Sequence, residues 1–309
     1  MPSGCQPCGL PRVAVLLAAF NGVLWIEEQL DSILTQTNVD VSVFISVDTS
    51  SDWTEAFCES YAERHANVTL LPPSGRFGGA ARNFFRLVRD VDYSVFDYVA
   101  FSDQDDVWHR DKLELAVARL KTDDFDAYSS NVTAFWPNGK RLELDKAQPQ
   151  VRCDHLFEAA GPGCTYVLNR RLADAFKASL LNHWDHAQQV TLHDWYCYAF
   201  ARNHGFRWFI DPTATMEYRQ HADNQVGANT GIASFTARLR TITNGWWPAQ
   251  VLLISQLTDG NHLLPRKPGQ STRLLFLKLI FKAKACRRRR RDKVLFVMAC
   301  LLASISRPK

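Results

Sequence analysis

The feature that most restricts the fold is a repeated alternation of apolar runs with amphipathic segments in the first part of the chain. The run from Val13 to Phe20 is almost wholly apolar and ends at Asn21-Gly22, as expected of a central parallel strand followed by a turn. The pattern predicts an α/β fold with a mostly parallel sheet and helices on both faces. The expected strands lie at about 41–47, 68–71 and 98–101, and the expected helices at about 26–34, 53–65 and 79–91.

The stretch from Phe101 to Trp108 places the carboxylates of Asp103, Asp105 and Asp106 directly after a predicted strand. Open α/β sheets bind their ligands at the carboxyl ends of strands. Adjacent carboxylates repel one another, and a hard divalent ion such as Mg²⁺, bound together with substrate phosphates, relieves that repulsion. The alternative is a solvated acidic turn that caps the helix beginning near Asp111. The local spacing leaves both interpretations open.

Several other polar positions also have two interpretations each. Asp48 ends a predicted strand, where it accepts a hydrogen bond from a nucleotide base or serves as a turn residue. The loop at 74–79, before a helix carrying Arg82, admits an anion or is a flexible connection. Asp194 begins an aromatic-rich helix as a cap or as a general base. A histidine such as His221 is usually a structural hydrogen-bonding group.

Beyond position 120 the pattern changes. Two strand-like segments, 126–135 and 140–144, flank Trp136-Pro137-Asn138-Gly139 and predict a hairpin. A further strand is expected at Tyr166 to Leu168, followed by a helix from Arg170.

Charge is distributed unevenly along the chain, although the formal net charge is only +4. From Pro265 to Lys309 there are 14 Lys and Arg against one acid, Asp292, whereas the preceding 264 residues hold 22 Lys and Arg against 31 Asp and Glu. The 46% hydrophobic content and nine Trp argue against global disorder. No amino-terminal signal peptide is recognised, so a cytosolic face is expected, with the eight cysteines reduced.

The basic carboxyl-terminal segment contains two apolar stretches, 274–281 and 294–305, on either side of the arginine run Arg287 to Arg291. Neither stretch has the about 20 apolar residues that a membrane-spanning helix needs. The pattern favours interfacial helices on an anionic membrane surface. The alternative is a pair of amphipathic helices packed on the rest of the protein. Nucleic-acid binding by the arginine run is less favoured because long apolar flanks are unusual for a solvated basic arm.

A set of short motifs follows in a defined order: Ala19-Phe20-Asn21-Gly22, the segment from Glu28 to Thr37, the acidic stretch, Gly163-Cys164, His193-Asp194-Trp195 and Tyr218-Arg219-Gln220-His221. In this order the motifs resemble those of the inverting glycosyltransferases of family 2, which have the GT-A fold. Within that family the resemblance is to the rhamnosyltransferase-like bacterial enzymes. It covers roughly Val13 to Gly227, and its specificity lies in the combination of motifs.

The resemblance implies a set of donor-binding residues. Asp48 matches the carboxylate that contacts the nucleotide base, although Val47 stands where a preceding Asp is common. Asp103 matches the carboxylate near the ribose, and Gln104 is counted with the nucleotide-sugar-binding residues. Arg82 is expected near the phosphates.

The resemblance also implies a metal ion and a catalytic base. Asp105 matches the ligand of a diphosphate-bound Mg²⁺ or Mn²⁺, and His221 matches a histidine near the metal and diphosphate. Asp194 matches the general base that takes the proton of the acceptor hydroxyl. The expected donor is a dTDP- or UDP-sugar, with rhamnose as the best guess.

The expected acceptor is a lipid-linked saccharide or polysaccharide in bacterial cell-surface polysaccharide synthesis, at the cytoplasmic face of the inner membrane. The expected organisation is an amino-terminal tail at 1–12, a GT-A domain at 13–230 and a basic, membrane-associating helical region at 231–309. Binding of nucleic acid is not expected. Two alternatives are a nucleotidyltransferase with a similar sheet and a non-catalytic membrane-bound scaffold.

Overall fold

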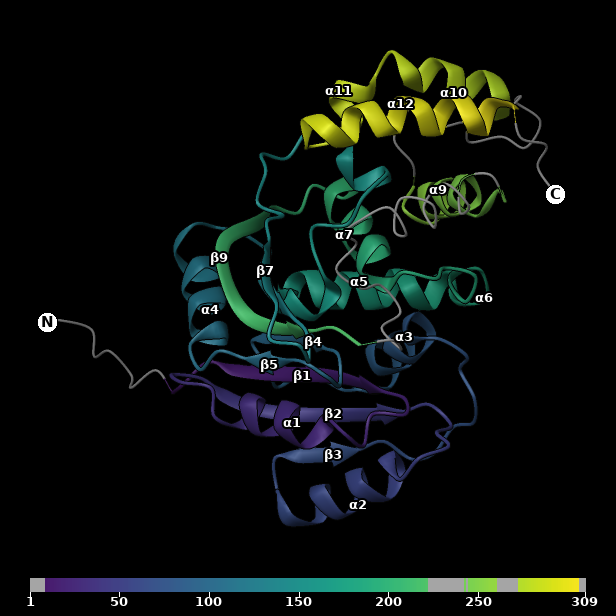
Figure 1. Cartoon of the computed structure of the whole chain (residues 1–309). Coiled ribbons are helices and arrows are strands. Elements are labelled where there is room, and N and C mark those ends of the chain that lie inside the picture. Colours follow the sequence, from purple (N-terminus) through teal and green to yellow (C-terminus); the bar gives the residue numbers. More distant parts are fainter. Residues whose placement is uncertain (1–8, 222–241, 243, 260–271, 306–309) are drawn as a thin grey trace, which may run out of the picture.

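A nine-stranded sheet forms the centre of the molecule, in the strand order β3-β2-β1-β4-β8-β6-β9-β5 with β7 paired to β6 (Figure 1). The computed structural model describes residues 9–221, 242, 244–259 and 272–305. The strands are β1 Arg12–Ala19, β2 Asp40–Val47, β3 Val68–Leu70, β4 Tyr98–Ser102, β5 Val107–Trp108, β6 Ala127–Phe135, β7 Arg141–Leu144, β8 Val167–Asn169 and β9 Trp208–Arg219.

The first four strands are parallel, because β1 pairs with β2 and β4, and β2 pairs with β3. Strand β1 is central, and its side chains alternate between two hydrophobic cores. Val13 and Val15 belong to one core, whereas Ala14 and Leu16 belong to the other. Burial on both faces explains why the strand is a continuous apolar run, and it confirms the predicted α/β fold.

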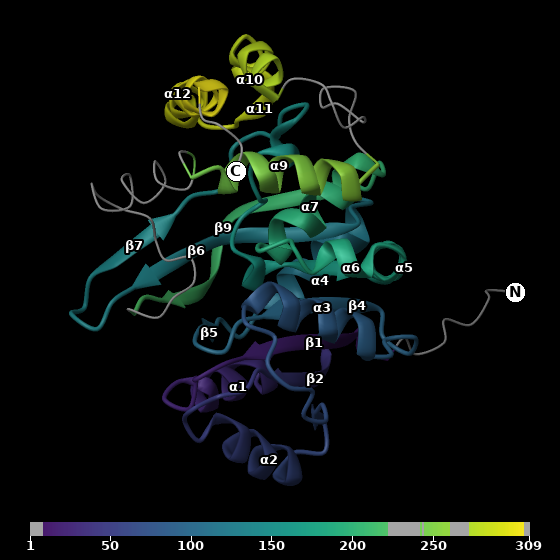
Figure 2. The same ribbon diagram turned by 90° about the vertical axis from the view of Figure 1, so that its right-hand side faces the viewer.

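Helices cover both faces of this sheet (Figures 1 and 2). One core contains residues of α1 Ile26–Leu34, α2 Thr54–Arg64 and α4 Lys112–Thr122. The other contains residues of α3 Ala80–Asp90, α5 Arg170–Asn182, α6 Trp184–Ala187 and α7 His193–Asn203. The first helices lie within one or two residues of the predicted bounds, since their apolar faces are marked clearly in the sequence.

The second half of the sheet is mixed, and of its strand pairings only the hairpin was predicted from the sequence. Strand β8 is antiparallel to β4 and β6, whereas β6 and β9 are parallel. The predicted hairpin is present as the antiparallel pair of β6 and β7. The two-residue strand β5 pairs with Met216 and Glu217 of β9, and this pairing was not predicted. It holds the end of β9 beside the acidic stretch.

The carboxyl-terminal part consists of α9 Trp246–Leu257, α10 Thr272–Ile280, α11 Ala283–Cys286 and α12 Arg290–Ile305. Helices α10 and α12 lie side by side above the sheet (Figures 1 and 2). Phe276 and Phe296 are buried in the same core as α7, so this region packs on the domain. The boundary predicted at position 230 lies outside the described residues. Within the described part of the chain, no helix is both long and apolar enough to cross a membrane.

Candidate active site

A large cavity opens at the carboxyl ends of β1, β2 and β4, with a volume of about 1390 Å³. Of the predicted site residues, those that line it are Asp48, Asp103, Gln104, Asp105, Asp194 and His221. Arg82 is not among the lining residues that the structure describes. The cavity therefore brings together six of the seven predicted positions, and these six come from four separate segments of the chain.

The acidic stretch is tied to the end of β9. The Nε2 atom of His221 lies 2.7 Å from Oδ2 of Asp105, and the His221 ring stacks on Trp25 with centroids 4.1 Å apart. The backbone N–H of Arg219 donates to Asp106 Oδ1 at 3.1 Å, and Nε of Arg219 donates to the backbone carbonyl of Asp105 at 2.8 Å. These bonds fix the Asp105 and His221 side chains relative to one another.

Two carboxylates of the acidic stretch, Asp103 and Asp106, form a polar cluster with Cys164. Burial, together with the charges of Asp105 and Asp194, raises the pKa of Asp103 to about 7. Asp106 is fully buried, and burial raises its pKa well above the ordinary value. The ligand atoms of Asp103, Asp106 and Cys164 lie within 4.8 Å of one another.

The cluster meets the chemical requirements of a divalent cation in part. The Oδ2 atom of Asp106 is buried without a hydrogen-bond partner among the described residues. Burial raises the pKa of the Cys164 thiol well above its usual range, so this sulfur is a poor metal ligand. The carboxylates are hard oxygen donors of the kind that Mg²⁺ and Mn²⁺ prefer. A divalent ion therefore fits the carboxylates of this loop rather than the thiol.

Asp48 lies at the end of β2 and organises the glycine loop. Its Oδ1 accepts the backbone N–H of Phe77 at 2.7 Å, and its Oδ2 accepts that of Gly78 at 2.8 Å. Gly78 has a φ of 74°, which a residue with a Cβ adopts only with strain. The carboxylate thus sets the shape of the loop at the cavity wall.

The side chains of Gln104 and Arg82 both form hydrogen bonds with backbone groups of other segments. Gln104 pairs with Phe20: its Oε1 accepts the Phe20 N–H at 2.6 Å, and its Nε2 donates to the Phe20 carbonyl at 2.7 Å. This pairing joins the acidic stretch to the end of β1. Arg82 Nε donates to the Gln188 carbonyl at 2.9 Å, and Nη1 donates to the Phe77 carbonyl at 3.2 Å.

Asp194 stands in the first turn of α7, where burial raises its pKa to about 6. Its Oδ1 accepts the backbone N–H of Trp195 at 2.8 Å. A Cβ at Gly163 would lie 3.1 Å from Asp194 Cβ and 2.6 Å from His193 Nε2, so only glycine fits there. The His193 ring also stacks on Phe84 with centroids 3.8 Å apart.

Two parts of the site were not predicted. Gly163 was noted only as part of a motif, and its contact with Asp194 depends on the tertiary fold. The arginine run was noted as a basic segment, yet Arg287, Arg288, Arg289 and Arg291 line the same cavity as the acidic stretch. Lysine and arginine content alone does not indicate which surface a segment contacts.

The fold and the site define a glycosyltransferase of the GT-A class, and comparisons with known proteins support this assignment. The chain is 41% identical over 288 residues to dTDP-rhamnosyl transferase RfbG of Shigella flexneri, covering 93% of this chain and 99% of that protein. The crystal structure of Staphylococcus aureus TarS 1–349 in complex with UDP has a similar fold, with a TM-score of 0.54 at 13% identity over 95% of this chain and 88% of that one.

The family can also be stated. The model of glycosyl transferase family 2 matches residues 14–166. A more distant relative, the Escherichia coli UDP-Glc:alpha-D-GlcNAc-diphosphoundecaprenol beta-1,3-glucosyltransferase WfgD, is 24% identical over 176 residues, covering 56% of this chain and 66% of that protein. The chain belongs to glycosyl transferase family 2. This confirms the resemblance drawn from the motifs and the expectation of an enzyme.

Proposed function

We propose that this glycosyltransferase transfers rhamnose from dTDP-rhamnose to a lipid-linked saccharide, with a divalent cation and with inversion at the anomeric carbon. One observation carries the proposal. Asp194 and the Asp105–His221 pair line a single cavity, in a chain that is 41% identical over nearly its whole length to a dTDP-rhamnosyl transferase.

The donor would lie at the carboxyl ends of β1, β2 and β4. Asp105 and His221 would hold Mg²⁺ or Mn²⁺, with Asp103 beside them, and the ion supplies neutralisation of the charge that develops on the leaving diphosphate. Asp48 and the glycine loop would bind the nucleotide. Arg82 would support the phosphate site through the glycine loop, since its Nη1 donates a hydrogen bond to the Phe77 carbonyl of that loop.

Asp194 is the proposed general base. It takes the proton of the acceptor hydroxyl as the oxygen of that hydroxyl forms a bond to the anomeric carbon. The bond from that carbon to the diphosphate breaks on the opposite face, and dTDP leaves, so the configuration inverts. A pKa of about 6 leaves the carboxylate ionised at neutral pH while keeping it more basic than an exposed aspartate. General-base catalysis of this kind contributes about 10² to 10⁴ in rate.

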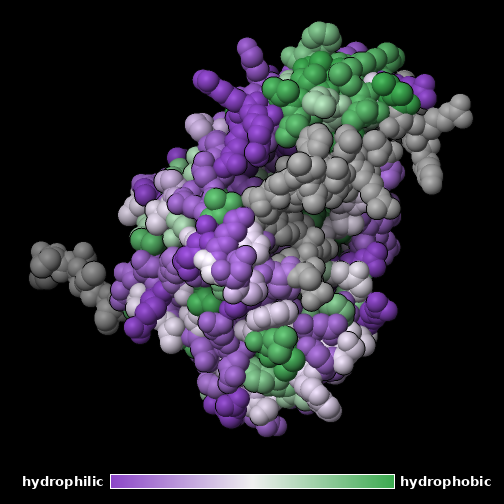
Figure 3. Space-filling model, in the orientation of Figure 1, coloured by the Kyte–Doolittle hydropathy of each residue, from purple (hydrophilic) through white to green (hydrophobic). Residues whose placement is uncertain are grey.

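The proposed acceptor is lipid-linked, and the proposed location is the cytoplasmic face of a membrane. The name of the relative WfgD includes a diphosphoundecaprenol acceptor. Exposed apolar side chains gather on α10, α12 and the turn that follows α10 (Figure 3). They are Leu274, Leu277, Phe281, Val294, Met298, Leu301 and Ile305. The exposed cations Arg273, Lys278 and Lys282 lie in the same segment, which suits an anionic lipid surface.

The test is a donor panel with the purified full-length protein and Mg²⁺ or Mn²⁺, using extracted bacterial lipid as the acceptor. Release of dTDP from dTDP-rhamnose is expected, with much slower release of UDP from UDP-glucose and UDP-N-acetylglucosamine. NMR of the product should show an anomeric configuration opposite to that of the donor. Retention of configuration, or turnover of the UDP-sugars alone, would overturn the proposal.

A further inference from the structure

The cavity is larger than a single small ligand needs. Its volume of about 1390 Å³ exceeds the 300–1,000 Å³ that is typical of small-molecule sites. One end is the acidic stretch and Asp194, where the proposed donor lies. The other end is built by the carboxyl-terminal segment, including residues of α9 and α12. The second end therefore offers space beyond the donor.

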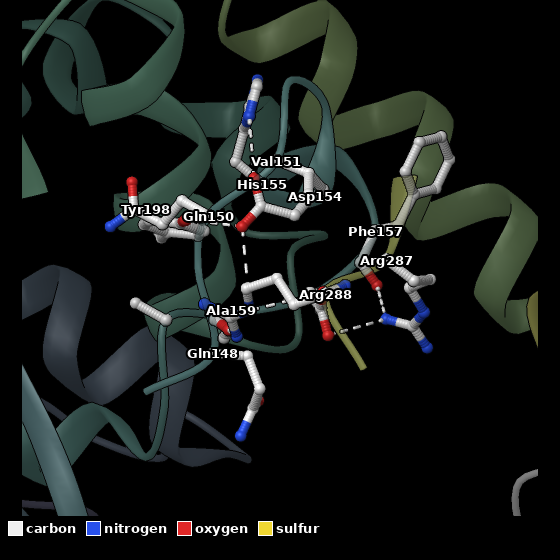
Figure 4. Close-up of polar contacts among 12 residues, drawn as sticks. Gln148, Gln150, Val151, Asp154, His155, Phe157, Ala159, Tyr198, Arg287 and Arg288 are labelled. Atoms are coloured by element: carbon white, nitrogen blue, oxygen red, sulfur yellow. Dashed lines mark hydrogen bonds and ion pairs between the residues drawn. The ribbon is translucent and has the colours of Figure 1, made fainter. Parts of the chain in front are cut away.

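The arginine segment is fixed to the wall of this cavity. Arg288, whose side chain is 2% exposed, donates through Nη2 to the Ala159 carbonyl at 2.6 Å, and its backbone N–H donates to Glu158 at 2.9 Å. Arg287 Nη1 donates to the Phe157 carbonyl at 2.7 Å (Figure 4). The stretch that these arginines hold leads within a few residues to Gly163, which contacts Asp194. The arginines are thus anchored to the segment that leads to the proposed base.

Arg289 and Arg291 keep exposed guanidinium surface at the cavity. Arg287 and Arg288 instead face a carboxylate of the protein, since Arg288 Nε lies 3.4 Å from Glu158 Oε1 and Arg287 Nη1 lies 3.6 Å from Glu158 Oε2. Among the residues that the structure describes, Arg289 has one acidic neighbour within 4 Å, Asp145 at 3.3 Å, and its side chain is 32% exposed. Arg291 is 70% exposed and contacts only the adjacent Asp292 at 3.5 Å among the described acidic groups. Exposed guanidinium groups such as those of Arg289 and Arg291 bind phosphate through charge-assisted hydrogen bonds.

The surface becomes apolar immediately beyond the arginines. Helix α12 lines the cavity with one apolar face, made by Leu295, Phe296, Ala299 and Leu302 at helical spacing. Trp246 and Trp247 at the start of α9 line the same cavity. The arginines can bind phosphate, and the apolar wall beside them can bind a hydrocarbon chain. Together they suit a molecule that carries a phosphate group attached to a hydrocarbon chain.

We propose that the carboxyl-terminal segment forms the acceptor subsite of this enzyme. Arg289 and Arg291, beside the anchored Arg287–Arg288 pair, bind the phosphate groups of a lipid-phosphate-linked saccharide. The cavity face of α12 and the tryptophans of α9 bind the first part of the lipid chain. The saccharide of the same molecule then lies at Asp194. This inference rests on the proposed function, since it names the residues that recognise the acceptor.

The test uses farnesyl diphosphate as the probe, titrated calorimetrically into the full-length protein with dTDP and Mg²⁺ already saturating the donor site. Farnesyl diphosphate is expected to bind at least about tenfold more tightly than farnesol, which lacks the diphosphate group, or inorganic diphosphate, which lacks the hydrocarbon chain. Binding of the three probes with similar affinity would overturn the proposal.

Matched double variants distinguish binding at the subsite from a general effect of the protein's positive charge. Arg289→Ala/Arg291→Ala is expected to weaken farnesyl diphosphate binding by about tenfold or more. Lys284→Ala/Arg290→Ala removes the same charge from exposed positions outside the cavity lining and is expected to change binding by less than about twofold. An equal loss in both double variants, or no loss in the first, contradicts the proposal.

A second pair of variants tests the apolar wall. Leu295 lines the cavity, whereas Leu301 on the same helix is 44% exposed and lies outside the lining. Leu295→Asp is expected to weaken farnesyl diphosphate binding severalfold more than Leu301→Asp does, with thermal unfolding of both variants confirming that they are folded. Equal effects overturn the lipid part of the proposal.

The donor panel is measured on the same preparations, so the two proposals fail separately. If dTDP-rhamnose is turned over but the arginine variants bind farnesyl diphosphate like the wild type, only the acceptor subsite is wrong. If no donor is turned over, the proposed function fails whatever the probe does.

Discussion

Nε2 of His221 lies 2.7 Å from Oδ2 of Asp105, although 116 positions separate the two residues in the chain. The histidine follows β9, and the aspartate follows β4. Arg219 joins the same segments through its backbone N–H and its guanidinium. The proposed metal site is therefore assembled by the pairing that brings β9 beside the acidic stretch, and its geometry depends on both segments.

Substitution of the proposed metal ligand should remove cation binding. Asp105→Asn is expected to weaken Mn²⁺ binding in the presence of dTDP by more than about tenfold, because a neutral amide replaces a hard anionic ligand. Mn²⁺ binding can be followed by electron paramagnetic resonance. Asp40→Asn, an exposed substitution at the start of β2, is the control and should bind Mn²⁺ like the wild type. Equal affinities of the Asp105→Asn variant and the wild type would refute the assignment.

The pH dependence of turnover should report the ionisation of Asp194. Burial raises the pKa of this carboxyl to about 6, and a base accepts a proton only when it is ionised. The rate constant kcat is expected to rise with pH up to about 6, falling by about tenfold for each unit below it, and to level off above about 7. Asp194→Asn should keep a low activity without this acidic limb. An unchanged limb in the variant would assign it to another group.

Gly163→Ala should displace Asp194 without affecting the donor site. The added Cβ would meet His193 Nε2 at 2.6 Å and Asp194 Cβ at 3.1 Å, so the start of α7 must shift. Because a displacement of about 1 Å costs on the order of 10² in rate, kcat should fall by about 10- to 100-fold. The Kd for dTDP, measured by calorimetry, should stay within about twofold. Gly9→Ala, which has open space around it, serves as the control.

Arg288 should be a major contributor to the stability of the carboxyl-terminal region. Its guanidinium is buried 3.4 Å from Glu158 and 3.7 Å from Asp154. Arg288→Ala removes a buried cation from both carboxylates, although Asp154 keeps Arg202 and Glu158 keeps Arg287 as a partner. The free energy of unfolding should therefore fall by about 3 kcal/mol. Arg290→Ala, exposed in the same run, should change it by less than about 0.5 kcal/mol. Urea denaturation measures the free energy of unfolding of both variants. Similar losses in the two variants would contradict the buried position of Arg288.

The fold of the first half was predictable because its strands are buried on both faces and its helices on one. Val13 to Phe20 reads as a continuous apolar run for that reason, and the bounds of β1 follow from it. A strand was predicted at the position of β8, but its antiparallel pairing was not predicted, and neither was the two-residue strand β5. Their pairing with β4 and β9 depends on partners far along the chain, which local periodicity does not encode.

The motifs predicted residues that line the candidate site, but they did not predict the contacts that these residues make. The motifs indicated Asp105, Asp194 and His221, and the cavity contains all three. The hydrogen bonds of Gln104 to the Phe20 backbone depend on the tertiary fold. The same holds for the arginine run, whose charge favoured a membrane surface while its packing places four arginines in the cavity wall.

The central claim is that Asp194 acts as the base in a transfer from dTDP-rhamnose. Its most direct test is dTDP release by the wild type and by Asp194→Asn, measured with lipid acceptor and Mg²⁺ beside the Kd for dTDP. The account predicts a loss of at least about 10²-fold in turnover with the Kd within about twofold. Turnover equal to the wild type, or loss of dTDP binding in the variant, would contradict it.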